Sequence, residues 1–224
     1  AKLSAWHFFS KGEHMKQKPG WVLPDLKEAQ KRTTNTIDRI DTFTIPEAAR
    51  MMGRGKTYFI STYGCQANER DSETLAGILD ELGFTPNETA EGSDVIIINT
   101  CAIRQNAEEK VLGEIGNFKR LYRENKDLII GVCGCMAQEE GLVETLLTKY
   151  RQVRLLFGTH NIQELPSMLY SCMFEGKKVV KIYSKEGEVY ENLPVHRFGT
   201  FKAWVNIMYG CDKFCTYCIV PYTR

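Results

Sequence analysis

The sequence predicts an α/β fold in which one parallel sheet carries helices on both faces, a doubly wound arrangement. Strand-like and helix-like segments alternate from residue 57 to residue 171, which implies right-handed crossovers and parallel pairing. Two of the strand-like segments, 95–98 and 128–132, are almost continuously apolar, as expected when both faces of a sheet are covered. The 224 residues are 43% hydrophobic and 11% aromatic, so the chain can bury a core of that kind.

Each element has its own pattern. The first helix, expected over 69–82, shows the i, i+3, i+4, i+7 spacing of one apolar face, carried by Leu75, Ile78, Leu79 and Leu82. Gly83 then supplies a helix stop. The remaining elements follow in alternation, with strands expected at 57–63, 94–100, 128–134 and 153–158 and helices at 105–125, 137–150 and 162–171.

Changes in composition predict four regions. Residues 1–55 form a partly flexible amino-terminal arm with a short helix around 26–33, and residues 56–173 form the α/β domain. Residues 174–196 are expected to be a connector with short strand-like pieces. Residues 197–224 begin a second domain, in which a strand at 201–209 leads into Gly210 and Cys211.

Charge and hydropathy narrow the class of protein. The formal net charge is +1, which neither indicates nor excludes a nucleic-acid partner. The aliphatic run 95–98 is too short to span a bilayer, and no apolar stretch near the start has signal-peptide length, so we expect a soluble cytoplasmic protein without a membrane partner. The chain starts with Ala and stops six residues after Cys218, and we expect it to be a fragment of a longer protein.

Eight cysteines stand out in such a chain, because a reducing compartment favours metal binding or catalysis over disulfides. Cys65, Cys101 and Cys135 each follow a predicted strand and precede a predicted helix. The carboxyl ends of parallel strands meet at one edge of a sheet, so three thiolates can converge there. Helix amino termini nearby favour the anionic form. Three cysteines in register predict an iron–sulfur site with one iron free of protein ligands, whereas each cysteine alone is explained by packing.

A second set, Cys211, Cys215 and Cys218, has the spacing C-x3-C-x2-C on one short loop. A zinc site needs four ligands, and no Cys or His follows Cys218. Ile219 stands where haem attachment requires His. Three thiolates therefore suit a [4Fe–4S] cluster with an open iron, which implies a substrate or cofactor at that iron.

This loop, with Tyr217 before its last cysteine, resembles the radical S-adenosylmethionine enzymes. The resemblance implies that the open iron binds S-adenosylmethionine, that Tyr217 packs near its adenine, and that electron transfer from the cluster yields a 5′-deoxyadenosyl radical. It also implies that the region from 197 onward is the truncated start of a radical-SAM partial (β/α) barrel.

The preceding domain is similar to the methylthiotransferase branch of these enzymes. The similarity rests on Gly64-Cys65-Gln66-Ala67-Asn68, on Asn99-Thr100-Cys101 and on Gly134-Cys135-Met136-Ala137-Gln138, and it covers roughly 56–224. The form at 64–68 resembles the bacterial branch that modifies isopentenyl-adenosine in tRNA more than the branches that modify a ribosomal protein or threonylcarbamoyl-adenosine in tRNA.

The resemblance implies 2-methylthiolation of N6-isopentenyl(dimethylallyl)adenosine at position 37 of the tRNA anticodon loop. It implies two [4Fe–4S] clusters as cofactors, one at Cys65, Cys101 and Cys135 and one at Cys211, Cys215 and Cys218. S-adenosylmethionine, tRNA and an electron donor are the expected partners. The rest of the barrel and an RNA-binding domain are expected in the full protein, so this chain alone is expected to be inactive.

Several residues have two interpretations. Cys133 and Cys172 fit core packing, although Cys133 could serve as a substitute ligand. His160 fits either a place beside the cluster or a helix cap. Asn68 and Arg104 could hydrogen-bond cluster sulfurs or loop backbone. Lys119, Arg120 and Arg123 form a basic patch that fits a solvated face better than a phosphate contact. The aromatic residues of the arm could stack on RNA bases or pack on the domain, and they are Trp6, Phe8, Phe9 and Trp21.

Two other functions compete with tRNA methylthiolation. The first is a structural zinc domain in which one metal joins cysteines from both sets. The second keeps the methylthiotransferase chemistry and changes its substrate to threonylcarbamoyl-adenosine tRNA or a ribosomal protein.

Overall fold

The computed structural model describes residues 38–40, 42–101, 105–182, 188–211, 213, 215–216, 218 and 220–223. The helix expected around 26–33 and the aromatic residues of the arm lie outside the described residues. Arg104 and Tyr217 lie outside them as well.

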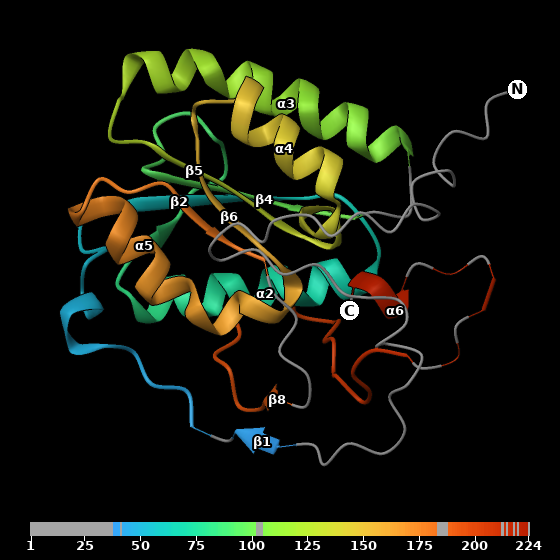
Figure 1. Ribbon diagram of the computed structural model, residues 1–224. Helices are drawn as coiled ribbons and strands as arrows, with labels where there is room; N and C mark the ends of the chain where they lie inside the picture. Colours follow the sequence, from blue (N-terminus) through green and yellow to red (C-terminus); the bar gives the residue numbers. More distant parts are fainter. Residues whose placement is uncertain are drawn as a thin grey trace, which may run out of the picture.

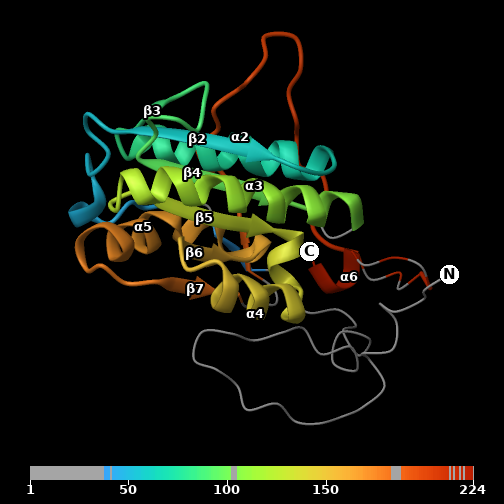
Figure 2. The ribbon, with the colours of Figure 1, turned by 90° about the horizontal axis from the view of Figure 1, so that it is seen from above.

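Six parallel strands form the main sheet, in the order β3-β2-β4-β5-β6-β7 (Figure 2). Their bounds are β2 (Thr57–Thr62), β3 (Thr85–Pro86), β4 (Val95–Thr100), β5 (Ile129–Gly134), β6 (Val153–Phe157) and β7 (Val179–Lys181). The chain leaves β2 for β3 on one side and returns to β4 on the other, so the strand order reverses between β2 and β4. The parallel α/β sheet expected from the sequence is confirmed.

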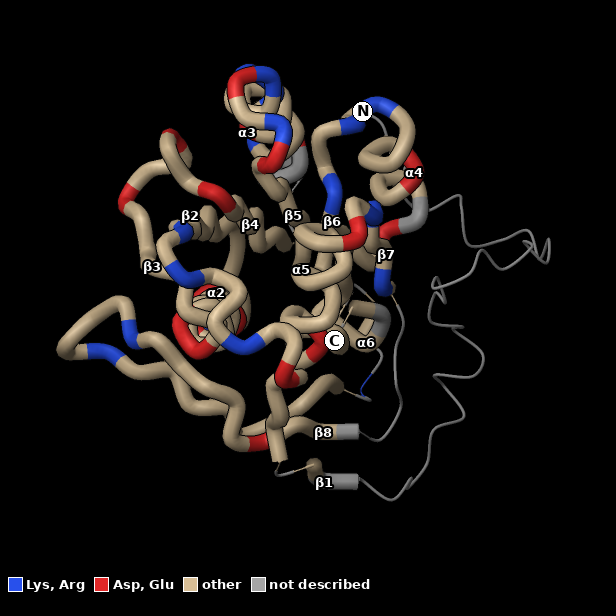
Figure 3. The backbone as a smooth tube through the Cα atoms, turned by 90° about the vertical axis from the view of Figure 1, so that its left-hand side faces the viewer, with Lys and Arg blue, Asp and Glu red and all other residues tan. Residues whose placement is uncertain are grey.

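Helices cover both faces of this sheet (Figures 1 and 3). The helices α2 (Gln66–Glu81) and α5 (Leu165–Phe174) lie on one face, and α3 (Gln105–Glu124) and α4 (Glu140–Lys149) lie on the other. Two apolar clusters fill the space between helices and sheet, one on each face. The doubly wound arrangement follows from these two separate cores.

The central strands explain why their sequences are apolar throughout. Every residue of β4 and β5 is buried. Side chains alternate between the faces, so Ile97 belongs to the cluster under α2 and α5 while Ile96 and Ile98 belong to the cluster under α3 and α4. Both faces therefore need apolar residues, which removes the alternation typical of a half-exposed strand.

Several boundaries differ from those expected. Helix α2 begins at Gln66 instead of Glu69, because the Cys65 carbonyl already accepts hydrogen bonds from the backbone N–H groups of Asn68 and Glu69. The helix expected at 137–150 is divided into η3 (Cys135–Gln138) and α4. The helix expected at 162–171 is divided into η4 (Thr159–Glu164) and α5, which has a proline in its first turn.

Short elements complete the fold. The connector supplies β7, which pairs with β6 and extends the main sheet. It also supplies β8 (Glu188–Tyr190), which pairs in parallel with β1 (Asp38–Ile40) from the end of the arm. Two single turns, η2 (Glu47–Ala49) and α6 (Val220–Thr223), lie near the two ends of the described chain. None of the helices among the described residues has the length and apolar character needed to cross a bilayer.

The strand expected at 201–209 is wrong. These residues are all described, and they have no regular secondary structure. Phe201, Ile207 and Met208 expose most of their side chains, and the segment pairs with no strand in the described part of the chain. A strand requires a hydrogen-bonded neighbour, so alternation of apolar side chains alone does not produce one.

Candidate metal centre

The three cysteines of the α/β domain lie at the ends of three neighbouring strands. Cys65 follows β2, Cys101 follows β4 and Cys135 follows β5, and these strands are adjacent in the sheet. All three strands are parallel, so the cysteines lie at one edge, beside the point where the strand order reverses. We call this place the cysteine edge.

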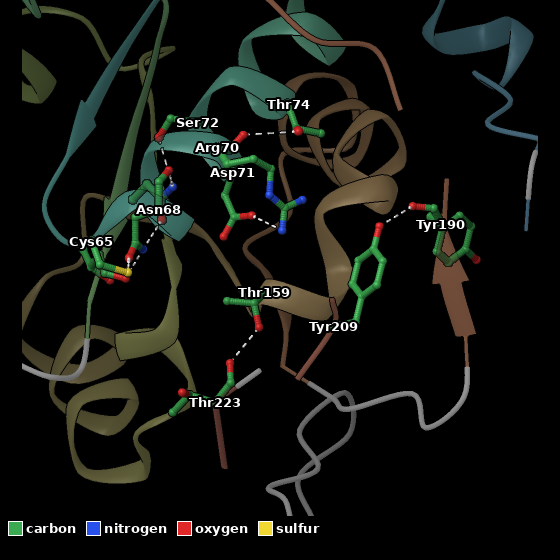
Figure 4. Close-up of polar contacts among 12 residues, drawn as sticks. Cys65, Asn68, Arg70, Asp71, Ser72, Thr74, Thr159, Tyr190, Tyr209 and Thr223 are labelled. Carbon is green, nitrogen blue, oxygen red and sulfur yellow. Dashed lines mark hydrogen bonds and ion pairs between the residues drawn. The ribbon is translucent and has the colours of Figure 1, made fainter. Parts of the chain in front are cut away.

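Cys65 occupies the N-cap position of α2 and is half-buried. Its Sγ lies 3.5 Å from Oδ1 of Asn68, one turn into the helix (Figure 4). Gly64 precedes it with a φ of 157°, and a Cβ there would lie 2.8 Å from the Cβ of Cys101. The absence of a side chain at Gly64 therefore lets the loops of Cys65 and Cys101 approach each other. The amino terminus of the 16-residue helix favours an anionic group at this position.

Two buried asparagines join the Cys65 loop to β4. Nδ2 of Asn68 donates to Oδ1 of Asn99 at 3.0 Å and to the carbonyl oxygen of Thr100 at 2.8 Å. In return, Nδ2 of Asn99 donates to the carbonyl oxygen of Asn68 and to Oγ of Ser72, both at 2.9 Å. Neither asparagine is exposed, and each side chain uses both of its amide hydrogens. This pair fixes the start of α2 relative to the residue before Cys101.

The loops of Cys101 and Cys135 are held by Thr100. Its hydroxyl donates to the carbonyl oxygen of Cys133 at 2.7 Å, and its neighbour Cys101 is buried. Gly134 packs directly on Thr100 with a φ of 95°, and a Cβ there would lie 2.3 Å from the Thr100 carbonyl oxygen. Only glycine fits this position, which places Cys135 at the start of η3.

The chemistry of this donor set fits a metal–sulfur cluster. None of the three cysteines is in a disulfide, and each comes from a separate loop held by buried hydrogen bonds. Thiolate ligands suit iron–sulfur clusters. Within the described residues, however, no three Cys, His, Asp or Glu side chains are grouped closely enough to hold a metal ion. Ligation by Cys65, Cys101 and Cys135 therefore stays a prediction, and the structure provides their common edge.

The second cysteine set lies in the chain before α6. Cys215 is exposed, Cys211 and Cys218 are half-buried, and the backbone N–H of Cys218 donates to the carbonyl oxygen of Cys215 at 2.9 Å. Helix α6 contacts η3, and Oγ1 of Thr159 donates to the carbonyl oxygen of Thr223 at 2.8 Å (Figure 4). The end of this segment therefore rests on the cysteine edge (Figure 1).

The segment 194–204 runs along α2 and is held by polar contacts. His196 pairs with Asp80, Arg197 with Glu73, and Lys202 with Glu69. Nε1 of Trp204 also donates to Glu69 at 3.0 Å. The hydrogen bond from Lys202 is the main reason that the pKa of Glu69 is lowered from 4.5. We call this segment the strap; Figure 3 shows acidic residues on the adjoining α2.

The strap passes close to α2 at Gly77, where a Cβ would lie 2.5 Å from the backbone of Pro194. Further along, Arg197 also donates to the carbonyl oxygen of Trp204 at 3.0 Å, which closes the strap on itself. The chain that leads to the second cysteine set is therefore positioned by α2, whose amino terminus carries Cys65.

The remaining predicted residues are distributed as follows. Cys133 and Cys172 lie in the apolar cluster under α2 and α5, and burial raises the pKa of the Cys172 thiol to about 11. His160 lies in η4, at the same edge as the cysteines, and its carbonyl oxygen accepts a hydrogen bond from Gln163. Arg120 in the basic patch pairs with Glu91 and Glu124, as expected for a solvated face.

Sequence reasoning missed Asn99, Thr100, Ser72 and Gln138. Asn99 and Thr100 belong to the motif that ends at Cys101, but polar residues are common at strand ends and the motif did not indicate their hydrogen-bond partners. Their partners lie 27 to 33 positions away, so only the strand pairing brings them together. Gln138 belongs to the motif that begins at Gly134, and this membership could have identified it as a candidate site residue.

Comparison with known proteins identifies the domain. Residues 57–158 match the sequence family described as "Uncharacterized protein family UPF0004". Over 201 residues, 90% of the chain, it is 56% identical to the tRNA-2-methylthio-N(6)-dimethylallyladenosine synthase of Geobacillus thermodenitrificans and 57% identical to that of Staphylococcus saprophyticus. The Bacillus cytotoxicus synthase is 56% identical over the same length.

The chain spans about two fifths of the length of these curated relatives, with coverage of 38%, 39% and 40%. Residues 57–158 therefore match the UPF0004 family model, and over most of its length the chain is similar in sequence to these synthases.

Proposed function

We propose that this chain is the cluster-binding portion of a tRNA methylthiotransferase that converts N6-dimethylallyladenosine at position 37 to its 2-methylthio form. The main observation that supports this proposal is the cysteine edge, where three cysteine motifs lie at the carboxyl ends of three adjacent parallel strands. The names of the relatives specify dimethylallyladenosine, which favours this substrate over threonylcarbamoyl-adenosine or a ribosomal protein.

The two cysteine sets would hold two [4Fe–4S] clusters. Cys65, Cys101 and Cys135 would bind the first, and Cys211, Cys215 and Cys218 the second. When bound, the clusters supply one-electron transfer and an open iron for S-adenosylmethionine or sulfur. Tyr217 would pack near the adenine of S-adenosylmethionine.

The chain's own residues prepare this chemistry by positioning. The asparagine pair and Thr100 hold the three thiol-bearing loops together, while the strap and α6 hold the chain before and after the second set. Cys101 and Cys135 are buried, which keeps water from most of the first site. Such a site would protect reactive sulfur. The proposed reaction is cytoplasmic, with tRNA and an electron donor as partners, and the names of the relatives support the tRNA substrate.

Metal analysis tests the cofactor assignment. The chain is reconstituted anaerobically with iron and sulfide, beside a variant in which Cys211, Cys215 and Cys218 are replaced by Ala. We expect iron and sulfide per chain to fall by half in the variant, with the absorbance of an iron–sulfur cluster retained. Loss of all metal from the variant, or zinc in both proteins, would contradict the proposal and support one shared structural site.

Nucleoside analysis tests the substrate. A strain without the gene should lose the methylthio group from dimethylallyladenosine and keep it on threonylcarbamoyl-adenosine. Restoration by the intact gene, but not by a gene with Cys101→Ala, ties the modification to the cysteine edge. Loss from threonylcarbamoyl-adenosine instead would assign the chain to that substrate.

A further inference from the structure

Gln138 is a buried polar residue whose amide has no hydrogen bond within the described structure. The residue is 6% exposed, and neither Nε2 nor Oε1 has a partner among the described residues. A buried amide without partners destabilises a folded protein, so such groups are uncommon. The unmatched donor and acceptor at this position therefore point to a group that the described residues do not supply.

The chain satisfies its other comparable amides. Gln152 is similarly buried, at 4% exposed, and its Nε2 donates to the carbonyl oxygen of Ile115 at 3.0 Å. Asn68 and Asn99 use both hydrogens of each amide. Gln138 is thus an exception among the described buried amides, and it lies at the cysteine edge.

The geometry of η3 relates Gln138 to Cys135. The two residues begin and end this 3-10 helix, three positions apart. A 3-10 helix has three residues per turn, so side chains at i and i+3 leave it in the same direction. The amide also packs on Gly158 at the end of β6, where a Cβ would lie 2.6 Å from Nε2 of Gln138.

We infer that the Gln138 amide donates a hydrogen bond to the sulfur of the cluster held through Cys135, and that Gln138 is a positioning residue for that cluster. The inference rests on the proposed function, because it requires a cluster at the cysteine edge. A hydrogen bond to a cluster sulfur stabilises the reduced, more negative state more than the oxidised state. Gln138 therefore raises the reduction potential of the first cluster.

The test measures this potential in a chain that carries only the first cluster, with Cys211, Cys215 and Cys218 replaced by Ala. After anaerobic reconstitution, the midpoint is followed by electron paramagnetic resonance during a redox titration. Gln138→Leu removes the donor and should shift the midpoint to a more negative value. Gly158→Ala keeps the amide and displaces it, because φ at Gly158 is −80° and accepts alanine, and it should shift the midpoint in the same direction.

Stability of the metal-free chain separates this role from packing. Gln138→Leu should leave its thermal midpoint unchanged or raised, since the amide has no partner to lose. The control Gln152→Leu should lower the thermal midpoint, since it removes a buried hydrogen bond to the Ile115 carbonyl oxygen, and should leave the reduction midpoint of the loaded chain unchanged.

The outcomes distinguish the role of Gln138 from the assignment of a cluster to the cysteine edge. A reduction midpoint that does not move in Gln138→Leu, or a metal-free Gln138→Leu chain that is clearly less stable than the parent, would overturn the role of Gln138 while the cluster site stands. A parent that takes up no iron would overturn the cluster assignment, and the role of Gln138 with it.

Discussion

Arg197 lies against Glu73 in the middle of α2, although 124 positions separate the two residues. The Glu73 carboxylate is nearly buried, whereas the Arg197 side chain is 40% exposed. The contact lies between the strap's polar contacts at Asp80 and Glu69, so three acidic positions of one helix hold one segment. The path of the chain toward the second cysteine set is therefore determined by charge on α2.

Replacing Arg197 by Met should release the strap. The substitution leaves a buried carboxylate without its cation and loses a charged hydrogen bond, which costs about 1.5–3 kcal/mol. Hydrogen exchange followed by mass spectrometry should show faster exchange at the backbone N–H of His196, which donates to the Glu73 carbonyl.

The control Arg120→Met removes a pair in which both partners are exposed, and it should leave exchange in the strap unchanged. Equal protection of the strap in both variants would show that the Arg197 contact does not hold it.

Replacing Asn99 by Leu should disrupt the cysteine edge. Asn68 and Ser72 would lose their buried partner, and the free energy of unfolding should fall by about 2–4 kcal/mol, the sum of several buried hydrogen bonds at ~1 kcal/mol each. Chemical denaturation measures this loss, and iron uptake after reconstitution should fall toward one cluster per chain.

Asn87→Ala serves as the control, because Asn87 makes two hydrogen bonds in a partly exposed turn away from the cysteines. Its effect should stay below ~1 kcal/mol. A similar cost in both variants would remove the special role assigned to the asparagine pair.

The sequence was sufficient for the parts of the fold that depend on local pattern. Apolar runs such as Val95–Ile98 indicate that a strand is buried on both faces of the sheet. The cysteines that follow the strands could be placed at one edge of the sheet from the expected topology alone. The helix at 69–82 was recognised by its apolar spacing. Its first turn was missed because residues 66–68 lie outside the apolar spacing that marks the helix, although the Cys65 carbonyl already accepts its first hydrogen bonds.

The remaining features depend on pairs that are distant in the chain. The match of Asn68 with Asn99 exists only when β2 pairs with β4, and a polar residue at a strand end carries no signal of it. The strap had a weak signal, because Glu69 and Glu73 are one helical turn apart and Asp80 is two turns further. Residues 201–209 alternate like a strand, yet the partner that would make them one is not in the described chain.

Replacing Gly134 by Ala should prevent the close approach of β5 and β4 at the cysteine edge. Two effects destabilise this variant. Alanine adopts a φ of 95° poorly, and its Cβ would lie only 2.3 Å from the Thr100 carbonyl oxygen. We expect a loss of more than ~3 kcal/mol in urea denaturation or failure to obtain folded protein.

Gly92→Ala isolates the first of these effects. Gly92 has a φ of 77°, and a Cβ there would meet no atom within 4 Å. Its cost should therefore stay near 1 kcal/mol. Equal losses for Gly92→Ala and Gly134→Ala would mean that backbone conformation alone, and not contact with Thr100, requires glycine at the cysteine edge.

Alkaline pH should weaken the fold through Cys172. Burial raises the pKa of its thiol from 9.0 to about 11, so the folded chain keeps a proton that the unfolded chain releases. The resulting stability is complete below pH 9 and is lost as the pH rises from 9 toward 11, by roughly 2 kcal/mol.

Denaturation of the parent and of Cys172→Ala at several pH values between 8 and 11 measures this loss of stability. The variant should be less stable at pH 8 because it loses buried packing, and the gap should narrow by pH 11, because alanine has no proton to release. If the two proteins instead lose stability in parallel across this range, ionisation of Cys172 does not contribute to the alkaline transition.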